Sequence, residues 1–167
     1  MMDPILTRRS VRKFTDELPS REVIEKLLEA GCAAPSACNR QTVDFFAVTN
    51  EEVLDKLSQS GRFTRFKSPL IIVVCGNLGR ALPLGLADYW IHDAGAATEN
   101  ILLAATSLGL GACWCGVHPQ KRVMEKVKEA LGLSEKQIPF ALIKLGFPAE
   151  NPAPHAEYEP KRVHFVE

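Results

Sequence analysis

Apolar positions along the chain follow two different spacings, and each spacing predicts one type of element. Apolar residues three or four positions apart predict amphipathic helices, while short apolar runs rich in β-branched residues predict buried strands. The predicted helices cover residues 3–8, 20 to about 31, 51–58, 88–108 and 123–131. The predicted strands cover residues 43–48, 70–75, 112–117 and 138–146. Because helices and strands mix without strict βαβ alternation, an α+β fold with one sheet covered by helices is expected.

Local signals refine three of these predictions. Ser20 is a typical N-cap for the second helix, and Gly132 is a typical stop for the helix at 123–131. The middle of the longest helix, 93–98 (DAGAAT), is unusually small, which suits a tightly packed central helix or a subunit interface. From Phe147 onwards the chain holds four prolines and no helical period, so this segment is expected to be extended.

Length and charge limit the kind of protein. A chain of 167 residues suits one domain, here expected to span 1–167. Twenty Lys and Arg balance twenty Asp and Glu, so no overall field attracts nucleic acid or a membrane, and any anion site must be local. The apolar stretch 88–110 carries interior charges that a membrane span does not tolerate. No signal-peptide pattern opens the sequence, and five cysteines indicate reduced thiols, so a cytoplasmic location is expected.

Common cofactor and metal motifs are missing from the sequence. No GxGxxG follows a predicted strand, and there is no GxxxxGK[ST] phosphate loop. Cys113 and Cys115 are spaced like a metal pair, but no second Cys or Cys/His pair completes the about four ligands that zinc needs. Strand alternation instead puts both thiols on one buried face and Trp114 on the other. No metal site is therefore predicted.

The sharpest chemical feature is the basic segment at residues 8–13 (RRSVRK), with four cations and a hydroxyl within six positions. The planar fork of arginine suits a phosphate, and a shielded charge-assisted hydrogen bond contributes about 1.5–3 kcal/mol. A solvated basic turn is the alternative. A second cluster, Arg62, Arg65 and Lys67, is most simply a solvated loop, with contact to a nicotinamide phosphate as the alternative.

Two further segments carry polar or unobstructed backbone groups. Residues 34–41 (APSACNRQ) offer hydrogen-bonding side chains from a loop at the start of a strand, although such residues often bind only their own backbone. Residues 109–116 (GLGACWCG) hold glycines that let a ligand approach backbone amides. In the long helix, His92 is expected to be a core or interface histidine, and Asp93 and Glu99 to be structural hydrogen-bonding groups.

Together these segments resemble the nitroreductase family of FMN-dependent oxidoreductases. The resemblance rests on RRSVRKF at 8–14, APSACNRQ at 34–41, DAGAATENILLAATSLGLG at 93–111 leading into WCG at 114–116, and a basic C-terminal arm, all in family order. It covers essentially the whole chain. It implies an α+β fold with a mostly antiparallel central sheet, an intertwined homodimer with flavin sites at the interface, and an arm at 148–167 that reaches the partner subunit.

The resemblance also implies which residues bind the cofactor. Arg8, Arg9 and Ser10 would hold the FMN phosphate and ribityl oxygens, and Arg12 would lie near the pyrimidine edge of the flavin. The backbone amides of Cys115 and Gly116 would face flavin N5 and O4. The loop that reaches the flavin from the other subunit would supply Pro35, Ser36, Asn39 and Gln41. Lys161 and Arg162 of the arm would close over the phosphate. No residue is assigned as a nucleophile.

The implied function is hydride transfer from NAD(P)H, through FMN, to nitroaromatic, quinone or similar acceptors by a ping-pong mechanism. The sequence departs from the family where Thr42-Val43 replaces the usual Pro-Trp, which bears on the choice of substrate. One alternative is another flavin reaction on the same fold, such as dehydrogenation, dehalogenation or flavin cleavage. A second is a non-catalytic flavin-binding or sensing protein. A nucleic-acid-binding module is disfavoured because the charge is neutral and no aromatics interleave the basic segment.

Overall fold

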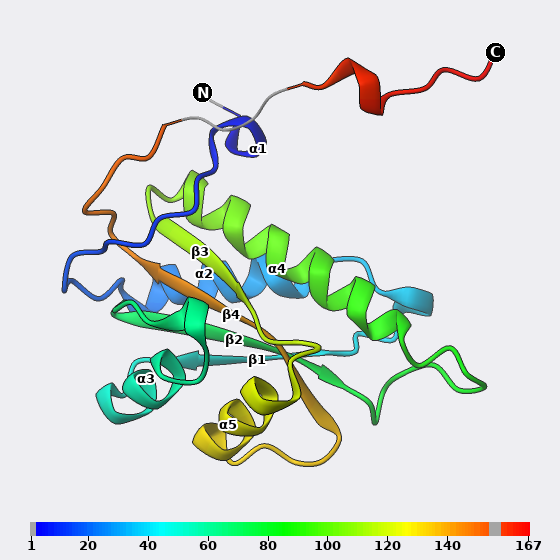
Figure 1. The fold of residues 1–167 in the computed structure, drawn as a ribbon, viewed down its shortest axis with the longest axis horizontal. Coiled ribbons are helices and arrows are strands. Elements are labelled where there is room, and N and C mark those ends of the chain that lie inside the picture. The colour runs from blue at the N-terminus through cyan, green and yellow to red at the C-terminus, as the bar shows by residue number, and fades with distance from the viewer. Residues whose placement is uncertain (1–2, 154–157) are drawn as a thin grey trace.

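The computed structural model describes residues 3–153 and 158–167 and holds one antiparallel sheet between two layers of helices (Figure 1). The strands are β1 (Val43–Val48), β2 (Leu70–Asn77), β3 (Gly111–Gly116) and β4 (Gln137–Gly146). The α-helices are α1 (Pro4–Thr7), α2 (Arg21–Cys32), α3 (Glu51–Ser58), α4 (Tyr89–Ser107) and α5 (Lys121–Leu131). Short 3-10 turns occupy Ala37–Asn39, Arg62–Thr64 and Pro160–Arg162. Every helix and strand predicted from the sequence is present, with ends that agree within two residues.

The strand order is β1-β2-β4-β3, and each neighbouring pair is antiparallel. The predicted α+β fold with a mostly antiparallel sheet is therefore confirmed. In β2, residues 70–76 are buried throughout, and so are residues 141–146 of β4. β3 lies at the edge of the sheet, so one row of its backbone groups is free to bind something other than a strand.

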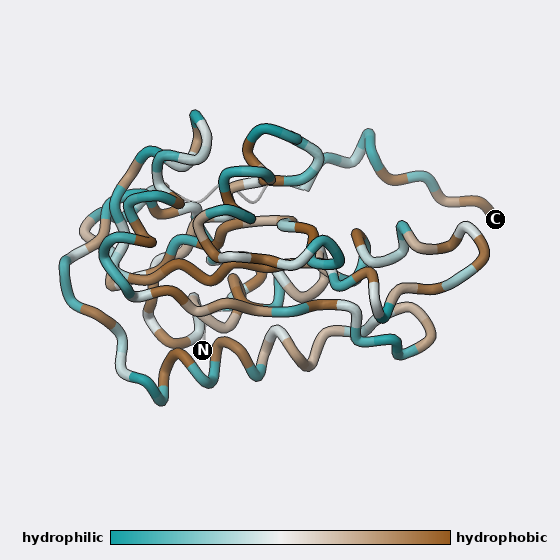
Figure 2. Tube along the Cα trace, turned by 90° about the horizontal axis from the view of Figure 1, so that it is seen from below, coloured by the Kyte–Doolittle hydropathy of each residue, from teal (hydrophilic) through white to brown (hydrophobic). Residues whose placement is uncertain are grey.

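Helices α2 and α4 cover one face of the sheet, and α3 and α5 cover the other (Figure 1). Successive residues of β2 alternate between these faces, since Ile72 packs with the α2–α4 core and Ile71 with the core beneath α3 and α5. In Figure 2 brown apolar segments run through the interior, and much of the upper and left-hand outline is teal.

The ends of the helices follow ordinary capping chemistry. The Ser20 hydroxyl accepts a hydrogen bond from the Val23 amide at 3.3 Å, and the Asn50 side chain does the same for Val53 at 3.1 Å. Gly132 ends α5 with a φ of 62°, a left-handed conformation that glycine adopts without steric cost. Both the Ser20 cap and the Gly132 stop agree with the sequence prediction.

The first and last parts of the body lie side by side. The Thr15 amide donates to the Phe147 carbonyl at 2.9 Å, and the Ala149 amide donates to the Lys13 carbonyl at 2.8 Å. The carboxylate of Glu150 accepts the Arg12 amide at 2.7 Å. This pairing ties the start of the C-terminal arm to the basic segment.

Beyond this pairing the arm leaves the body. Residues 158–167 are all exposed and run away from the rest of the chain in Figure 1. Of the predicted arm at 148–167, residues 154–157 lie outside the described part. The extended prediction is wrong at Pro160–Arg162, where a 3-10 turn forms with Pro160 at its first position, a place where proline fits because no N–H is needed there. No helix of the described residues is long and apolar enough to cross a bilayer.

Candidate functional site

The basic segment runs beside the first residues of β3. Ser10 forms a parallel bridge with Ala112, and the Val11 amide donates to the Ala112 carbonyl at 3.0 Å. The Val11 side chain is buried, so alternation along this short strand turns Ser10 and Arg12 away from the core. The segment approaches closely because Gly111 has no side chain, since a Cβ at Gly111 would lie 2.8 Å from the Val11 Cβ.

Arg8 and Arg9 of this segment contact one carboxylate and two backbone carbonyls. Arg8 forms an ion pair with Glu99, Nε to Oε1, at 3.2 Å, with both side chains about one-third exposed or more. Arg9 donates from Nη1 to the carbonyls of Leu6 and Arg8 at 3.0 and 2.6 Å. Because an exposed ion pair contributes little, a phosphate can compete for the Arg8 guanidinium. Glu99 is thus the ion-pair partner of a predicted site residue.

The other end of β3 presents an open backbone at Gly116. A Cβ placed on Gly116 would meet no atom within 4 Å, and the residue is exposed. Gly116 lies four residues beyond Ala112, so the open backbone is about 13 Å along the strand from the basic segment. One edge strand therefore carries cations at one end and an unobstructed amide at the other.

The hydrogen-bond alternation of β3 separates the two predicted amides. The Ala112 carbonyl faces Val11 at the outer edge, and the Val117 amide donates inwards to the Phe140 carbonyl at 2.9 Å. Since backbone groups alternate along a strand, the Gly116 amide faces outwards and the Cys115 amide faces β4. This geometry fits the prediction for Gly116, whereas for Cys115 it differs from the predicted amide contact.

Cys113 and Cys115 lie on the buried face as predicted, each 3% exposed, while Trp114 on the opposite face is 37% exposed. Interaction between the two neighbouring thiols lowers the pKa of Cys113 and raises the pKa of Cys115. Within the described residues, no cluster of three or more His, Cys, Asp or Glu side chains could hold a metal.

Residues 35–41, called the cofactor loop after their predicted role, form part of the wall of a cavity of about 380 Å³ between α2, β1 and α4. Pro35, Ser36 and Gln41 line this cavity. The Ser36 hydroxyl accepts the Gln41 amide at 2.9 Å, so it closes the loop on itself. Asn39 is exposed and does not line the cavity.

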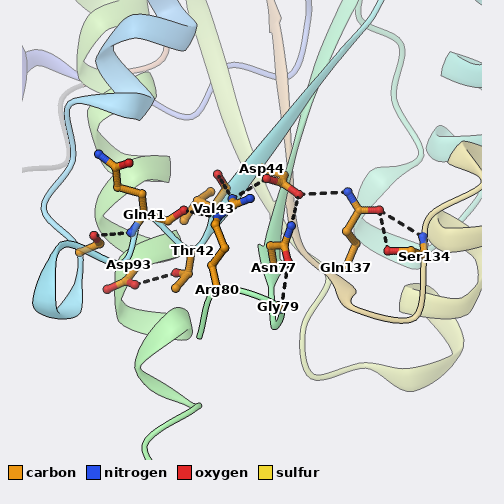
Figure 3. A network of polar contacts seen from close by, with 11 residues as sticks. Gln41, Thr42, Val43, Asp44, Asn77, Gly79, Arg80, Asp93, Ser134 and Gln137 are labelled. Carbon is orange, nitrogen blue, oxygen red and sulfur yellow. Dashed lines mark hydrogen bonds and ion pairs between the residues drawn. The ribbon is translucent and has the colours of Figure 1, made fainter. Parts of the chain in front are cut away.

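Asp93 of α4 binds the cofactor loop and the residue that follows it. Its Oδ1 accepts the Ala37 amide at 2.9 Å. Its Oδ2 accepts the Thr42 hydroxyl at 2.6 Å (Figure 3). Asp93 and Thr42 are buried, 4% and 2% exposed. The predicted structural role of Asp93 is confirmed. Thr42 supplies a donor that the usual family proline lacks, which gives the departure from Pro-Trp a physical role.

Three predicted positions lie away from these groups. Lys161 and Arg162 are exposed on the arm, which leaves the body in Figure 1, and no ion pair joins either of them to another described residue. His92 is exposed and packs edge-on against Tyr89 at 5.4 Å, so the expectation of a core histidine is wrong. Its other predicted role, at a subunit interface, stays a prediction.

A second cavity, about 470 Å³, lies on the opposite face of the sheet, and a buried lysine lies beside it. Lys144 of β4 is completely buried and donates from Nζ to the Ser58 hydroxyl at 2.7 Å and to the Phe66 carbonyl. The ammonium also lies 4.6 Å from the centre of the Phe66 ring. Burial lowers the pKa of Lys144 to about 8.

Because Lys144 is buried, we expect the free energy of unfolding to increase as the pH rises above 8. The Lys144 pKa is about 8 in the folded chain, against about 10.4 when unfolded, so the unfolded chain binds more protons between these pH values. The free energy of unfolding should therefore rise by about 2 kcal/mol from pH 8 to pH 10 relative to Lys144→Met. Urea unfolding of both proteins at each pH measures this difference. Equal pH dependence in the two proteins would contradict it.

The sequence analysis missed two residues that support the cofactor loop. Arg80 binds it directly, and Asp44 binds Arg80. Arg80 lies in the turn after β2 and Asp44 lies in β1, and their side chains meet at 2.5 Å (Figure 3). Neither residue belongs to a recognisable motif, and they are 36 positions apart. The one available signal was a charged residue inside an otherwise apolar predicted strand, at Asp44.

Comparison with known proteins adds to this geometry. The family model described as the nitroreductase family matches residues 5–62 and 64–147. This chain belongs to the nitroreductase family. The nitroreductase match spans the basic segment, the cofactor loop and β3, which contain the predicted site residues other than Lys161 and Arg162.

Relatives of this nitroreductase cover nearly its whole length. A protein of Methanothermobacter thermautotrophicus, provisionally named NADH dehydrogenase/NAD(P)H nitroreductase, is 38% identical over 167 residues, covering 98% of this chain and 85% of that one. A crystal structure from Parabacteroides distasonis with the same provisional name has a TM-score of 0.92 at 36% identity, covering 98% and 96% of the two chains. A provisionally named nitroreductase from Desulfovibrio desulfuricans, solved in complex with FMN, has a TM-score of 0.82 at 30% identity, covering 98% and 95%.

Proposed function

We propose that this chain is an FMN-dependent oxidoreductase that passes hydride from NADH or NADPH to an electron-poor acceptor such as a nitroaromatic or a quinone. The observation that carries the proposal is the layout of β3, with Arg8, Arg9 and Ser10 beside its first residues and the open Gly116 backbone at its far end. The names of the relatives and the FMN complex of the Desulfovibrio desulfuricans protein support it.

The residues present fit FMN. Arginine side chains bind phosphate through two parallel N–H groups, and two arginines directly precede Ser10 in the chain. At the other end, the absence of a side chain on Gly116 lets a flat ring approach the backbone. The separation of about 13 Å suits a ligand with an anionic end and a ring end.

When bound, FMN supplies reversible hydride chemistry, and the protein supplies position and charge. Arg8 and Arg9 would neutralise the phosphate, and the outward Gly116 amide would donate a hydrogen bond to the ring system. Arg12 is an exposed cation on the same segment and would favour negative charge on the ring. No side chain acts as a nucleophile. Reductant and acceptor would use one open face in turn, in a ping-pong sequence.

We also propose that the working form is a homodimer. Pro35, Ser36, Asn39 and Gln41 lie on the cofactor loop, and Lys161 and Arg162 lie on an exposed arm. Among the described residues, the ion-pair partner of Arg8 is Glu99 and none of these. A second copy would bring its cofactor loop and arm to this site. The exposed Phe165 and Val166, 83% and 97% exposed, would then gain an apolar contact. The free cysteines suit a cytoplasmic location.

The absorption spectrum of the purified protein tests this function. We expect bound flavin bands that disappear when NADPH or NADH is added without oxygen and return when a quinone or nitroaromatic follows. Arg9→Ala should raise the FMN dissociation constant about tenfold, because a charge-assisted hydrogen bond to phosphate is lost. Arg21→Ala, which removes an exposed arginine of α2, should leave it unchanged.

Three outcomes would contradict the proposal in different ways. A protein that takes up no FMN is not a flavoprotein. A flavin that NAD(P)H does not reduce indicates another flavin reaction on this fold. A flavin that is reduced but reoxidised no faster when acceptors are added indicates a binding or sensing protein. Light scattering or sedimentation measures the oligomeric state, and a monomer that binds FMN tightly would remove the dimer from the proposal.

A further inference from the structure

The cofactor loop has an unfavourable backbone. Cys38, Asn39 and Gln41 have φ values of 50°, 53° and 50°, in the left-handed region. For residues other than glycine this conformation costs free energy, although asparagine tolerates it better than most. Three such residues within four positions persist only where surrounding contacts hold them. The loop therefore needs supports besides its internal Ser36–Gln41 hydrogen bond.

Arg80 binds the end of this loop through several contacts. Its Nε donates to the Gln41 carbonyl at 2.7 Å, and its Nη2 donates to the Val43 carbonyl at 3.2 Å (Figure 3). The contact is reciprocal, since Nε of Arg40 donates to the Arg80 carbonyl at 2.9 Å. The guanidinium thus bridges the left-handed residue Gln41 and the first residue of β1.

Asp44 holds the Arg80 guanidinium in this position. Its Oδ1 accepts Nη2 of Arg80 at 2.5 Å, while its Oδ2 accepts Asn77 at 2.9 Å and Gln137 at 3.0 Å (Figure 3). Burial alone would raise the pKa of Asp44, but the hydrogen bonds from Arg80, Gln137 and Asn77 outweigh it and lower that pKa. Asp44 is therefore an anion that accepts hydrogen bonds from the end of β2, from the turn after it and from the start of β4.

Arg80 and Asp93 support the loop from two different sides. Asp93 fixes the Ala37 amide and the Thr42 hydroxyl from α4, and Arg80 fixes the Gln41 and Val43 carbonyls from the turn after β2. Both residues line the 380 Å³ cavity whose wall the loop partly forms. Asp93 supplies acceptors for an amide and a hydroxyl, and Arg80 supplies N–H donors for two carbonyl groups.

We infer that Arg80, oriented by Asp44, is a positioning residue that holds the cofactor loop in its left-handed form, ready to contact FMN. The inference rests on the proposed function, because it assigns a use to the loop that this function requires. Arg80 need not touch the cofactor, since it acts through the backbone of Gln41.

Arg80→Met and Asp44→Asn separate this role from ordinary support of the fold. Arg80→Met removes the hydrogen bonds to the loop carbonyls, while Asp44→Asn keeps the arginine and replaces one acceptor oxygen of its partner by an amide donor. Hydrogen exchange of the apoprotein should be about tenfold faster at the Ala37 and Gln41 amides in Arg80→Met. The FMN dissociation constant should rise about tenfold as well. Asp44→Asn should change both quantities in the same direction but less, about threefold, and no change in either would remove Asp44 from the inference.

Arg21→Met is the matched control, because it removes an exposed arginine whose partner, Glu25, lies on the same helix. Unchanged loop exchange in Arg80→Met would overturn the inference, whatever the affinity for FMN. Faster exchange with unchanged FMN binding would overturn the link between loop and cofactor. If wild type binds no FMN but Arg80→Met still speeds exchange, the proposed function fails while the support of the loop by Arg80 stands.

Discussion

Replacing Gly111 by valine should weaken FMN binding about 100-fold and destabilise the chain. A Cβ at this position lies 2.8 Å from Cβ and Cγ1 of Val11, a distance that forces one of the two strands to move. The mobile partner is the basic segment, which is joined to β3 by one bridge, whereas β3 is fixed by the whole β4 ladder. Valine should therefore push Arg8 and Arg9 out of register with Gly116.

Steric overpacking sets the expected loss of stability, and displacement of the arginines sets the expected loss of FMN affinity. Overpacking at a buried strand position costs about 1–3 kcal/mol, measured as a loss in the free energy of unfolding. Displacing two arginines from a phosphate should raise the FMN dissociation constant about 100-fold, at about tenfold for each charge-assisted hydrogen bond. Titration with FMN and urea unfolding measure the two quantities.

Gly61→Ala is the matched control for this experiment. Its φ is −143°, and its new Cβ would meet Val123 at 3.5 Å, an ordinary contact. It should leave FMN affinity unchanged. If Gly111→Val folded and bound FMN as tightly as wild type, the spacing between the basic segment and β3 would not matter, and the phosphate role of Arg8 and Arg9 would lose its support.

The helices and strands were predictable because the residues that determine each of them are close together in the sequence. The apolar run at Leu70, the Ser20 cap and the Gly132 stop depend on neighbours in sequence, and the structure confirms each. The pairing order of the strands is not local and was not predicted; only the mostly antiparallel character of the sheet was expected, from the family resemblance. The Pro160–Arg162 turn was missed because three residues are too few to show a period.

The site was predictable only as separate pieces. The cations at Arg8 and the glycine at Gly116 stand out in the sequence, but which amide of β3 faces outwards depends on the ladder with β4. Arg80 gave no signal, because two of its partners are carbonyl groups that every residue carries and the third, Asp44, lies 36 positions away in the sequence. A contact to backbone leaves no complementary residue type to find, so only coordinates reveal it.

Backbone strain in the cofactor loop connects these observations to function. A loop held in left-handed conformations by buried contacts presents its side chains without first having to order itself, so a ligand loses less of its binding energy. Asp93 provides the most buried of these contacts, since both of its oxygens are used and the residue is 4% exposed. Its removal should therefore affect stability and cofactor affinity together.

Asp93→Ala should lower the free energy of unfolding by about 2–4 kcal/mol, because it leaves the Ala37 amide and the buried Thr42 hydroxyl without an acceptor. FMN affinity should fall about tenfold or more as the loop relaxes.

Asp93→Asn is the control: its one carbonyl oxygen can still accept Ala37, and the Thr42 hydroxyl can turn to accept the new amide, so most of both losses should be recovered. If Asp93→Asn behaved like Asp93→Ala, the charge of Asp93 and not its two acceptors would be what the loop requires. Urea unfolding with and without saturating FMN distinguishes these results, since ligand-linked stabilisation appears only in variants whose loop still binds.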